Sequence, residues 1–313
     1  MSTLRAVCIL GPTGSGKTGA ALALARELPV TVVNYDSRQV YADFPIVTAQ
    51  PDEAERAACP HELYGFLPTS EAMTAARFAE LARAGILRAR EQGRVPVLVG
   101  GTGLYLRALE QGLADIPPVP QEVRDWVLGR MEREGSAALH DDLAQIDPPT
   151  AARLHKNDTQ RITRALEVFL GTGRPLSAWF EDQKLGRTGA GLCRVELCKV
   201  GLSCTLRELE PGLRQRIEVM LERGAVDEVR RAYAATPERS APGFSGIGCT
   251  ELLAHLLDGM ELEEACALWF RNTRAYAKRQ LTWFAKEQGV RWVRPEGLGR
   301  LTELVRAWDS SAA

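Results

Sequence analysis

The stretch GPTGSGKT, residues 11–18, decides the fold of this 313-residue chain. An apolar run at residues 6–10 precedes it, and an Ala- and Leu-rich stretch at residues 19–27, which favours a helix, follows it. A loop of the form G-x-x-x-x-G-K-[ST] between a strand and a helix is typical of a phosphate-binding loop. Its backbone N–H groups turn toward phosphate oxygens, and the following helix N-terminus adds partial positive charge. The sequence therefore predicts a binding site for a di- or triphosphate.

Each polar residue of this loop has a predicted role. Lys17 brings a positive charge to the outer phosphates, and the hydroxyl of Thr18 is placed to bind Mg²⁺. A glycine-rich loop without a ligand is the weaker alternative, because a strand and a helix flank the motif. Thr13 and Ser15 offer further hydroxyl donors. The residues predicted to bind the diphosphate or nucleotide are Gly11, Pro12, Thr13, Gly14, Ser15, Gly16, Lys17 and Thr18.

Strand and helix signals alternate through the first third of the chain. Residues 31–34 (TVVN) are a β-branched run and residues 95–99 an apolar one, and residues 72–91 between them have the spacing of a helix. Strands that alternate with helices indicate a parallel sheet. Unbroken apolar strands indicate that both faces of this sheet are covered. We therefore predict an α/β fold with a P-loop NTPase-like parallel sheet core flanked by helices.

A second, smaller domain is predicted within this core. The stretch DIPPVP, residues 115–120, breaks the pattern, and helical signals then run to about residue 179. A glycine-containing loop at 186–191 leads to a strand at 194–202. We expect an all-helical insertion domain at 114–192, and a core formed by 1–113 and 193–313 with basic C-terminal helices. Predicted helices are 121–134, 137–145, 149–155 and 159–170 in the insertion, and 210–234, 249–257 and 262–287 in the last third.

Composition excludes several classes of protein. Hydrophobic residues make up 45% and charged residues 25%, as in ordinary globular proteins. No apolar run approaches the ~18 residues of a membrane span, and the first residues are too few for a signal-peptide core. Seven scattered cysteines fit a reducing, cytoplasmic setting rather than a disulfide framework or a zinc site. The net charge is −1, yet residues 271–294 hold seven Lys or Arg and one acid. Such a basic segment either binds a nucleic-acid phosphate backbone or forms a solvated helix face.

Two polar residues follow predicted strands at the sheet edge where open α/β sheets bind ligands. Asp36 could take a proton from a nucleophile, orient a metal or cap a helix. Thr102 could face the crevice or cap the helix predicted at 104–109. The strand at 95–99 lacks the terminal Asp of many P-loop NTPases, which disfavours a motor-type ATPase but leaves a small kinase open.

Several stretches together resemble the tRNA dimethylallyltransferases, also called isopentenyl-tRNA transferases. They occur in family order across nearly the whole chain. The stretches are GPTGSGKT (11–18), YDSRQVY (35–41), TAQP (48–51), PHEL (60–63), LVGGTGLYLRAL (98–109), NDTQRITRALEVF (157–169), LRQRIEVML (213–221) and TRAYAKRQLTWF (273–284).

This resemblance implies a reaction. The phosphate-binding loop would hold dimethylallyl diphosphate, and the N6 amine of the adenosine 3′-adjacent to the anticodon (tRNA position 37) would attack its allylic carbon. The tRNAs would be those that read codons beginning with U, and N6-isopentenyladenosine and diphosphate would form. The resemblance implies Asp36 as general base and Lys17, Thr102 and Arg216 as further catalytic residues, with Mg²⁺ as cofactor. We expect a monomer that binds no membrane.

The resemblance also implies that 1–113 and 193–313 form the catalytic core and that the insertion domain at 114–192 contacts tRNA. The target adenosine must be extruded from the anticodon loop. At 159–170, Ile162, Leu166 and Phe169 are predicted to share an apolar helix face, with Asp158 as a cap. At 271–286, the basic residues are predicted to lie on one face and Ala277, Leu281 and Phe284 on another. The expected tRNA contacts are Asp36, Ser37, Arg38, Gln39, Thr102, Arg124, Gln160, Arg161, Ile162, Thr163, Arg164, Gly248, Arg274, Lys278, Arg279 and Gln280.

Two other functions fit part of the sequence. A P-loop small-molecule or nucleoside kinase would use residues 11–18 and Asp36 but leaves the basic segments without a role. A non-catalytic RNA-binding module would leave Lys17, Thr18 and Asp36 without a role. ATP turnover with a small acceptor would favour the kinase, and RNA affinity without base modification would favour the module.

Overall fold

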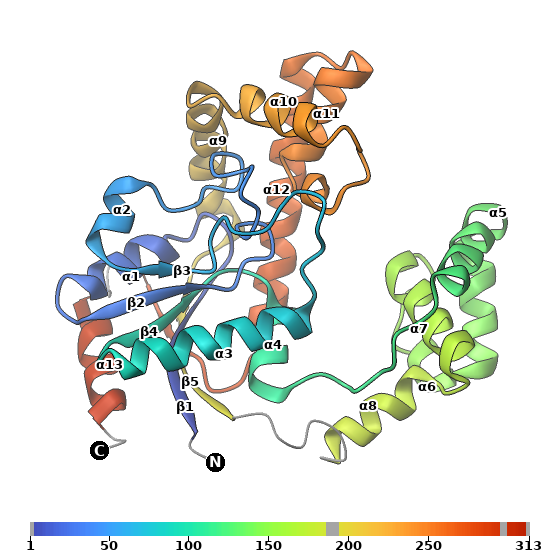
Figure 1. The fold of residues 1–313 in the computed structure, drawn as a ribbon, viewed down its shortest axis with the longest axis horizontal. Coiled ribbons are helices and arrows are strands. Elements are labelled where there is room, and N and C mark those ends of the chain that lie inside the picture. Colours follow the sequence, from blue (N-terminus) through green and yellow to red (C-terminus); the bar gives the residue numbers. More distant parts are fainter. Residues whose placement is uncertain (1–2, 186–193, 295–298, 311–313) are drawn as a thin grey trace. The chain divides into compact units, whose positions relative to one another are not determined.

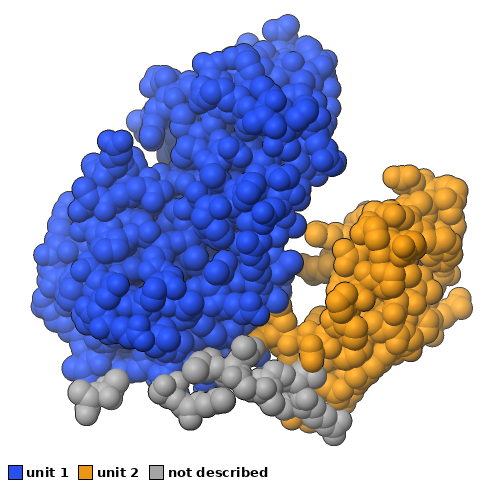
Figure 2. Space-filling view, in the orientation of Figure 1, with its two compact units in different colours: residues 1–111, 193–313 blue, residues 112–192 orange. Residues whose placement is uncertain are grey.

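The computed structural model describes residues 3–185, 194–294 and 299–310, which form two compact units (Figures 1 and 2). The larger unit comprises residues 1–111 and 193–313, and the smaller comprises residues 112–192. The loop predicted at 186–191 lies outside the described residues.

Within the described residues, the larger unit is built on a six-stranded parallel sheet of order β3-β2-β4-β1-β5-β6. In the central register, Val7 of β1 lies opposite Val97 of β4 and Cys198 of β5. The strands β2 and β4 are buried at every position, because helices cover both faces. The predicted α/β fold is thus confirmed. The strands are β1 (Leu4–Leu10), β2 (Val30–Asn34), β3 (His61–Glu62), β4 (Val95–Val99), β5 (Val195–Leu202) and β6 (Arg291–Val293).

Alternate side chains of β1 point to opposite faces of the sheet, as the two-residue period requires. Val7 and Ile9 pack with α1 (Lys17–Ala25) and α13 (Gly299–Ser310) in one core cluster. Cys8 and Leu10 pack with α3 (Ala75–Glu91) and α4 (Gly103–Gln111) in another. The sheet therefore lies between two helical layers, which hold the loops at its carboxyl edge in place.

A third core cluster joins the C-terminal helices to the segment that follows β2. It contains Phe44, Leu213, Phe244 and Trp269. The helix α12 extends from these helices along the sheet toward α4 (Figure 1). The elements are α9 (Leu206–Glu222), α10 (Ala225–Ala235), the 3-10 helix η1 (Pro242–Ser245), α11 (Cys249–Asp258) and α12 (Leu262–Phe284).

Several element predictions need correction. The single helix predicted at 210–234 is two helices, because Gly224 has a φ of 92° and ends the first. The helix predicted at 262–287 ends at Phe284. The sequence does not predict α2 (Glu53–Ala58), β3, β6, α8 (Leu176–Lys184) or α13, and the helix predicted at 149–155 ends at Ala151. The strands β3 and β6 have two and three residues, too few to show a period.

The smaller unit is helical within its described residues. Its core contains Val127, Leu139, Leu143, Ile162 and Leu166. The helices predicted at 121–134 and 137–145 form one element, α5, which kinks at Gly135, where φ is 79° and ψ is 166°. The unit begins two residues before the insertion domain predicted at 114–192. Its helices are α5 (Gln121–Ile146), α6 (Pro148–Ala151), α7 (Thr159–Thr172) and α8 (Leu176–Lys184).

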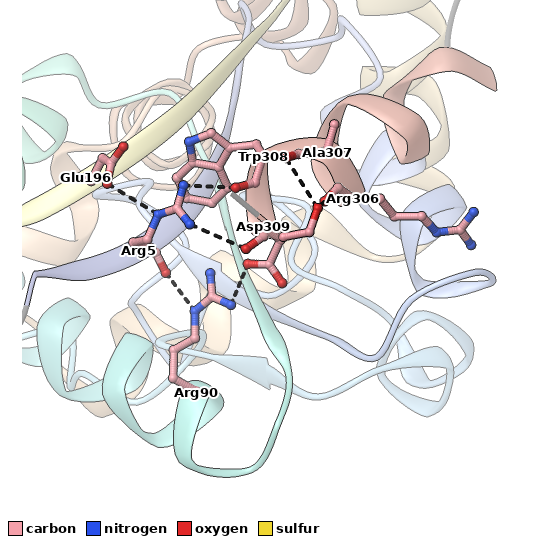
Figure 3. A network of polar contacts seen from close by, with 8 residues as sticks. Arg5, Arg90, Glu196, Arg306, Ala307, Trp308 and Asp309 are labelled. Carbon is pink, nitrogen blue, oxygen red and sulfur yellow. Dashed lines mark hydrogen bonds and ion pairs between the residues drawn. The ribbon is translucent and has the colours of Figure 1, made fainter. Parts of the chain in front are cut away.

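Two arginines fix the C-terminal end of α13 to the sheet (Figure 3). Arg5 Nη2 donates to the Trp308 carbonyl at 2.9 Å, and its guanidinium lies 4.0 Å from the centre of the Trp308 ring. Arg90 Nη1 pairs with Asp309 Oδ1 at 2.7 Å, and Arg90 Nε donates to the Arg5 carbonyl at 2.9 Å. Cations at a helix C-terminus interact favourably with its carbonyl groups and dipole. Among the described helices, none has the length and apolarity to cross a bilayer.

Candidate active site

The phosphate-binding loop joins β1 to α1 at the carboxyl edge of the sheet. Gly14 and Gly16 have φ values of 80° and 85°, which glycine adopts without strain. No side chain of the described residues caps α1, so its first N–H groups are left to bind a ligand. Ser15 Oγ is buried and has no hydrogen-bond partner among the described residues. These unsatisfied donors fit the oxygens of a phosphate group.

Lys17 is a half-buried cation at the start of α1. Its Nζ donates to the carbonyls of Gly11 at 2.8 Å and Pro12 at 2.7 Å. Burial lowers the pKa of Lys17 to about 8, although the negative charge of Asp36 acts in the opposite direction. Arg216 lowers this pKa further through like-charge repulsion. A phosphate anion beside Lys17 would therefore favour its protonated form.

Asp36 lies directly beyond β2. Its N–H donates to Asn34 Oδ1 at 2.7 Å, and its Oδ1 accepts the Arg38 N–H at 2.8 Å. This local bonding fixes a turn after the strand. The next described helix, α2, begins at Glu53 and is capped by Asp52, so the helix-cap interpretation of Asp36 is wrong.

Thr102 connects the ends of β4 and β2. Its Oγ1 accepts the Ser37 N–H at 3.0 Å and lies 3.3 Å from Ser37 Oγ. Its carbonyl accepts the Tyr105 N–H at 3.0 Å, so α4 begins beside it. The side chain is thus turned toward the residue after Asp36 while the backbone starts a helix.

Two helices bring further side chains to Asp36. Arg216 of α9 is half-buried, and its pKa is lowered by burial and raised by the charge of Asp36. Tyr276 of α12 places its Oη 3.4 Å from the Gly101 carbonyl, and burial and Asp36 raise its pKa. The sequence analysis missed Tyr276. Its position four residues before Gln280 was the available signal, because such residues share one side of a helix.

Two predicted tRNA contacts beside Asp36 already hold neighbouring loops. Arg38 Nη1 donates to Ser245 Oγ at 2.7 Å and to the Pro242 carbonyl at 3.3 Å. Gln39 Nε2 donates to the carbonyls of Ala49 at 2.6 Å and Thr48 at 3.1 Å. Gln39 therefore ties together two parts of the segment between β2 and α2, and Arg38 ties this segment to η1.

The division of α12 into faces is confirmed, with one exception. Ala277 and Phe284 are buried, and Leu281 is half-buried. Gln280, predicted to contact tRNA, is only 4% exposed and bonds to the backbone of Thr13 and Gly101 instead. Arg274 pairs with Glu210 Oε1 of α9 at 2.6 Å. The exposed polar residues of α12 include Arg271, Arg274, Lys278, Arg279 and Thr282.

Gly248 has a packing role in the structure. Its φ is 97°, and a Cβ added there would lie 2.6 Å from Val47 Cγ1. Its N–H donates to Glu251 Oε2 at 2.6 Å. A side chain at this position would therefore disturb both the backbone and the core.

The smaller unit exposes some of its predicted tRNA contacts and buries others. Gln160, Arg161 and Arg164 are exposed on α7, whereas Ile162 and Thr163 are buried in the core, so the last two offer no side-chain surface. Asp158 forms no side-chain cap, which corrects that prediction, and instead pairs with Arg161 at 3.5 Å. Arg124 is half-buried, and its Nε has no partner among the described residues.

Comparison with protein families decides the family of the chain. The model described as IPP transferase matches residues 39–287, and the model described as isopentenyl transferase matches residues 4–60. The first match spans more than half of the sequence. The chain belongs to the IPP transferase family. This membership agrees with the resemblance in the sequence and with the phosphate-binding loop at the sheet edge.

Individual proteins of the IPP transferase family are similar over nearly the whole chain. The tRNA dimethylallyltransferase of Maridesulfovibrio salexigens is 49% identical over 302 residues, which cover 96% of each chain. The crystal structure of a tRNA isopentenylpyrophosphate transferase from Bacillus halodurans is 33% identical, with a TM-score of 0.69 over 97% of this chain and 96% of that one. A eukaryotic dimethylallyltransferase acting on tRNA is 28% identical, with a TM-score of 0.77 over 98% of this chain and 78% of that one.

Proposed function

We propose that this protein transfers a dimethylallyl group from dimethylallyl diphosphate to the N6 amine of an adenosine in tRNA. The adenosine is the one 3′-adjacent to the anticodon (position 37), in tRNAs that read codons beginning with U. The named relatives support this proposal. The observation that carries it is that Asp36 after β2, Thr102 after β4 and the phosphate-binding loop after β1 lie at the same carboxyl edge of the parallel sheet.

The donor half of the site binds the diphosphate. The N–H groups at the start of α1, Lys17 and Ser15 offer hydrogen bonds to its oxygens, and Arg216 adds a positive charge from α9. When the allylic C–O bond breaks, the diphosphate keeps the electron pair and gains negative charge. Donors already held in place stabilise that charge in the transition state.

The acceptor half of the site removes a proton. The adenosine amine forms the new N–C bond, and its proton passes to the carboxylate of Asp36. The Ser37 N–H fixes the Thr102 side chain next to Asp36. There the Thr102 hydroxyl can orient the adenine ring. A base positioned within hydrogen-bond reach of the proton is what this step needs.

Mg²⁺ fits the hydroxyl of Thr18, since Mg²⁺ prefers oxygen ligands and commonly binds substrate phosphates. Among the described residues, no group of three or more His, Cys, Asp or Glu side chains could hold a metal. We propose that the hydroxyl of Thr18 would hold the ion beside the bound diphosphate. When bound, Mg²⁺ neutralises charge on the departing diphosphate.

Exposed basic side chains in each unit offer a surface for RNA. On α12 they include Arg271, Lys278 and Arg279, and on α7 they include Arg161 and Arg164. Such side chains neutralise backbone phosphates, while single-stranded loops are where bases are read. Arg124, Ser37, Arg38 and Gln39 complete the proposed contacts, and the protein is proposed to act as a monomer.

A transfer assay tests the proposal. The full chain, Mg²⁺, labelled dimethylallyl diphosphate and unmodified tRNA are incubated together, and ATP with small hydroxylated acceptors is tested separately. We expect label in tRNA, and labelling at least about a hundredfold slower after substitution of Asp36 by Asn. Phosphate transfer from ATP to a small acceptor, with no label in RNA, would contradict the proposal.

A further inference from the structure

Gln280 links two loops of the site from the inner side of α12. Its Oε1 accepts the Thr13 N–H at 2.8 Å, and its Nε2 donates to the Gly101 carbonyl at 3.0 Å. The partners fix the orientation of the amide, because a backbone N–H only donates and a carbonyl only accepts. The side chain is 4% exposed, so water does not replace these bonds readily.

The neighbouring backbone is shaped for this contact. A Cβ at Gly101 would clash with Gln280 Nε2, and a Cβ at Gly103 would clash with the ring of Trp283. Tyr276 Oη also reaches the Gly101 carbonyl, at 3.4 Å. Three residues on one side of α12 thus hold the segment that carries Thr102.

We propose that Gln280 is a positioning residue for transfer, which sets the spacing between the phosphate-binding loop and the segment that holds the acceptor. Thr13 belongs to the loop that binds the diphosphate. Gly101 precedes Thr102, which bonds to Ser37 beside Asp36. The inference rests on the proposed function. Transfer rates are sensitive to such spacing, because a misplacement of about 1 Å can cost about a hundredfold.

A variant that lacks both hydrogen bonds of the Gln280 side chain distinguishes a role in positioning from a role in substrate binding. Gln280→Met keeps the approximate shape of the side chain but leaves the Thr13 N–H without its partner and the Gly101 carbonyl with only the Tyr276 hydroxyl, at 3.4 Å. We expect kcat to fall about tenfold or more. The KM for tRNA and the Kd for inorganic pyrophosphate should stay within about threefold, because the groups that contact those ligands are unchanged.

A carboxyl group at this position gives a sharper test. In Gln280→Glu, a protonated carboxyl offers one donor and one acceptor and can form both bonds, whereas an ionised carboxyl offers only acceptors and repels the Gly101 carbonyl. The negative charge of Asp36 disfavours the ionised form, and the positive charges of Lys17 and Arg216 favour it. We expect the ratio of variant kcat to wild-type kcat to rise severalfold between about pH 8 and about pH 6. Taking the ratio of the two kcat values cancels the pH dependence that comes from groups present in both proteins.

The matched control is Gln288→Met, an exposed glutamine shortly after α12. Its kcat and its pH profile should match those of the wild type. A fall in kcat for Gln280→Met, with recovery of Gln280→Glu at low pH, supports the inference. If Gln280→Met does not fold, as judged by circular dichroism, the pH ratio of Gln280→Glu decides alone.

Two results would overturn it in distinguishable ways. If the wild type transfers label but the Gln280→Glu ratio is independent of pH, Gln280 only packs the core and the proposed function stands. If the wild type does not transfer label to tRNA, the proposed function fails and the inference fails with it.

Discussion

Lys17 gives the site a pH dependence that binding alone can measure. Burial lowers the pKa of Lys17 from 10.5 to about 8. A diphosphate binds the protonated lysine, so affinity falls as the proton is lost. With a pKa of about 8, the protonated fraction is about 0.9 at pH 7 and about 0.1 at pH 9. We therefore expect the Lys17 contribution to weaken pyrophosphate binding about tenfold between these pH values.

Isothermal titration calorimetry with inorganic pyrophosphate checks this expectation. Lys17→Met is the reference, because its pH dependence contains the titration of pyrophosphate itself but not that of the lysine. The ratio of wild-type to Lys17→Met affinity should fall about tenfold from pH 7 to pH 9. At pH 8, the wild type should take up about half a proton more than the variant on binding. A ratio that does not change with pH would refute the reasoning.

Three further perturbations address other parts of the molecule. Asp36→Asn should lower the transfer rate at least about a hundredfold, because the proton of the adenosine amine loses its acceptor. The affinity for tRNA, measured by filter binding, should stay within about threefold of the wild type. A near-normal transfer rate would exclude a general-base role. Arg5→Ala should lower the free energy of unfolding in urea by about 1–3 kcal/mol, because the carbonyls at the end of α13 lose their donor, and an unchanged midpoint would contradict this. Lys278→Met should weaken tRNA binding and reduce the slope of log affinity against log salt by about 0.7–0.9, whereas Arg230→Met on α10 should change neither.

The sequence predicts the parts of the fold that local pattern determines. The loop at 11–18 and the strand β4 need only a motif and an apolar run. The meeting of Asp36 and Thr102 follows from topology, because both come after parallel strands whose carboxyl ends share an edge. The structure adds the hydrogen bond between Ser37 and Thr102.

Other features depend on packing that no local pattern shows. A glycine within a helical pattern is ambiguous, so the break at Gly224 was missed. Gln280 lies in a basic stretch, yet one turn of α12 places it inward against Thr13 and Gly101. Ile162 and Thr163 lie within a segment that resembles RNA-binding stretches, but their side chains fill the core of the smaller unit. Which residues of a motif face a ligand is decided by the helix orientation.

Mass spectrometry of nuclease-digested tRNA tests the central claim most directly. Unmodified tRNA is incubated with dimethylallyl diphosphate, Mg²⁺ and either the wild type or Asp36→Asn. We expect the wild type to add the mass of one dimethylallyl group to the adenosine 3′-adjacent to the anticodon, and the variant to leave it unmodified. Unmodified adenosine with the wild type, or equal modification by both proteins, would contradict the account.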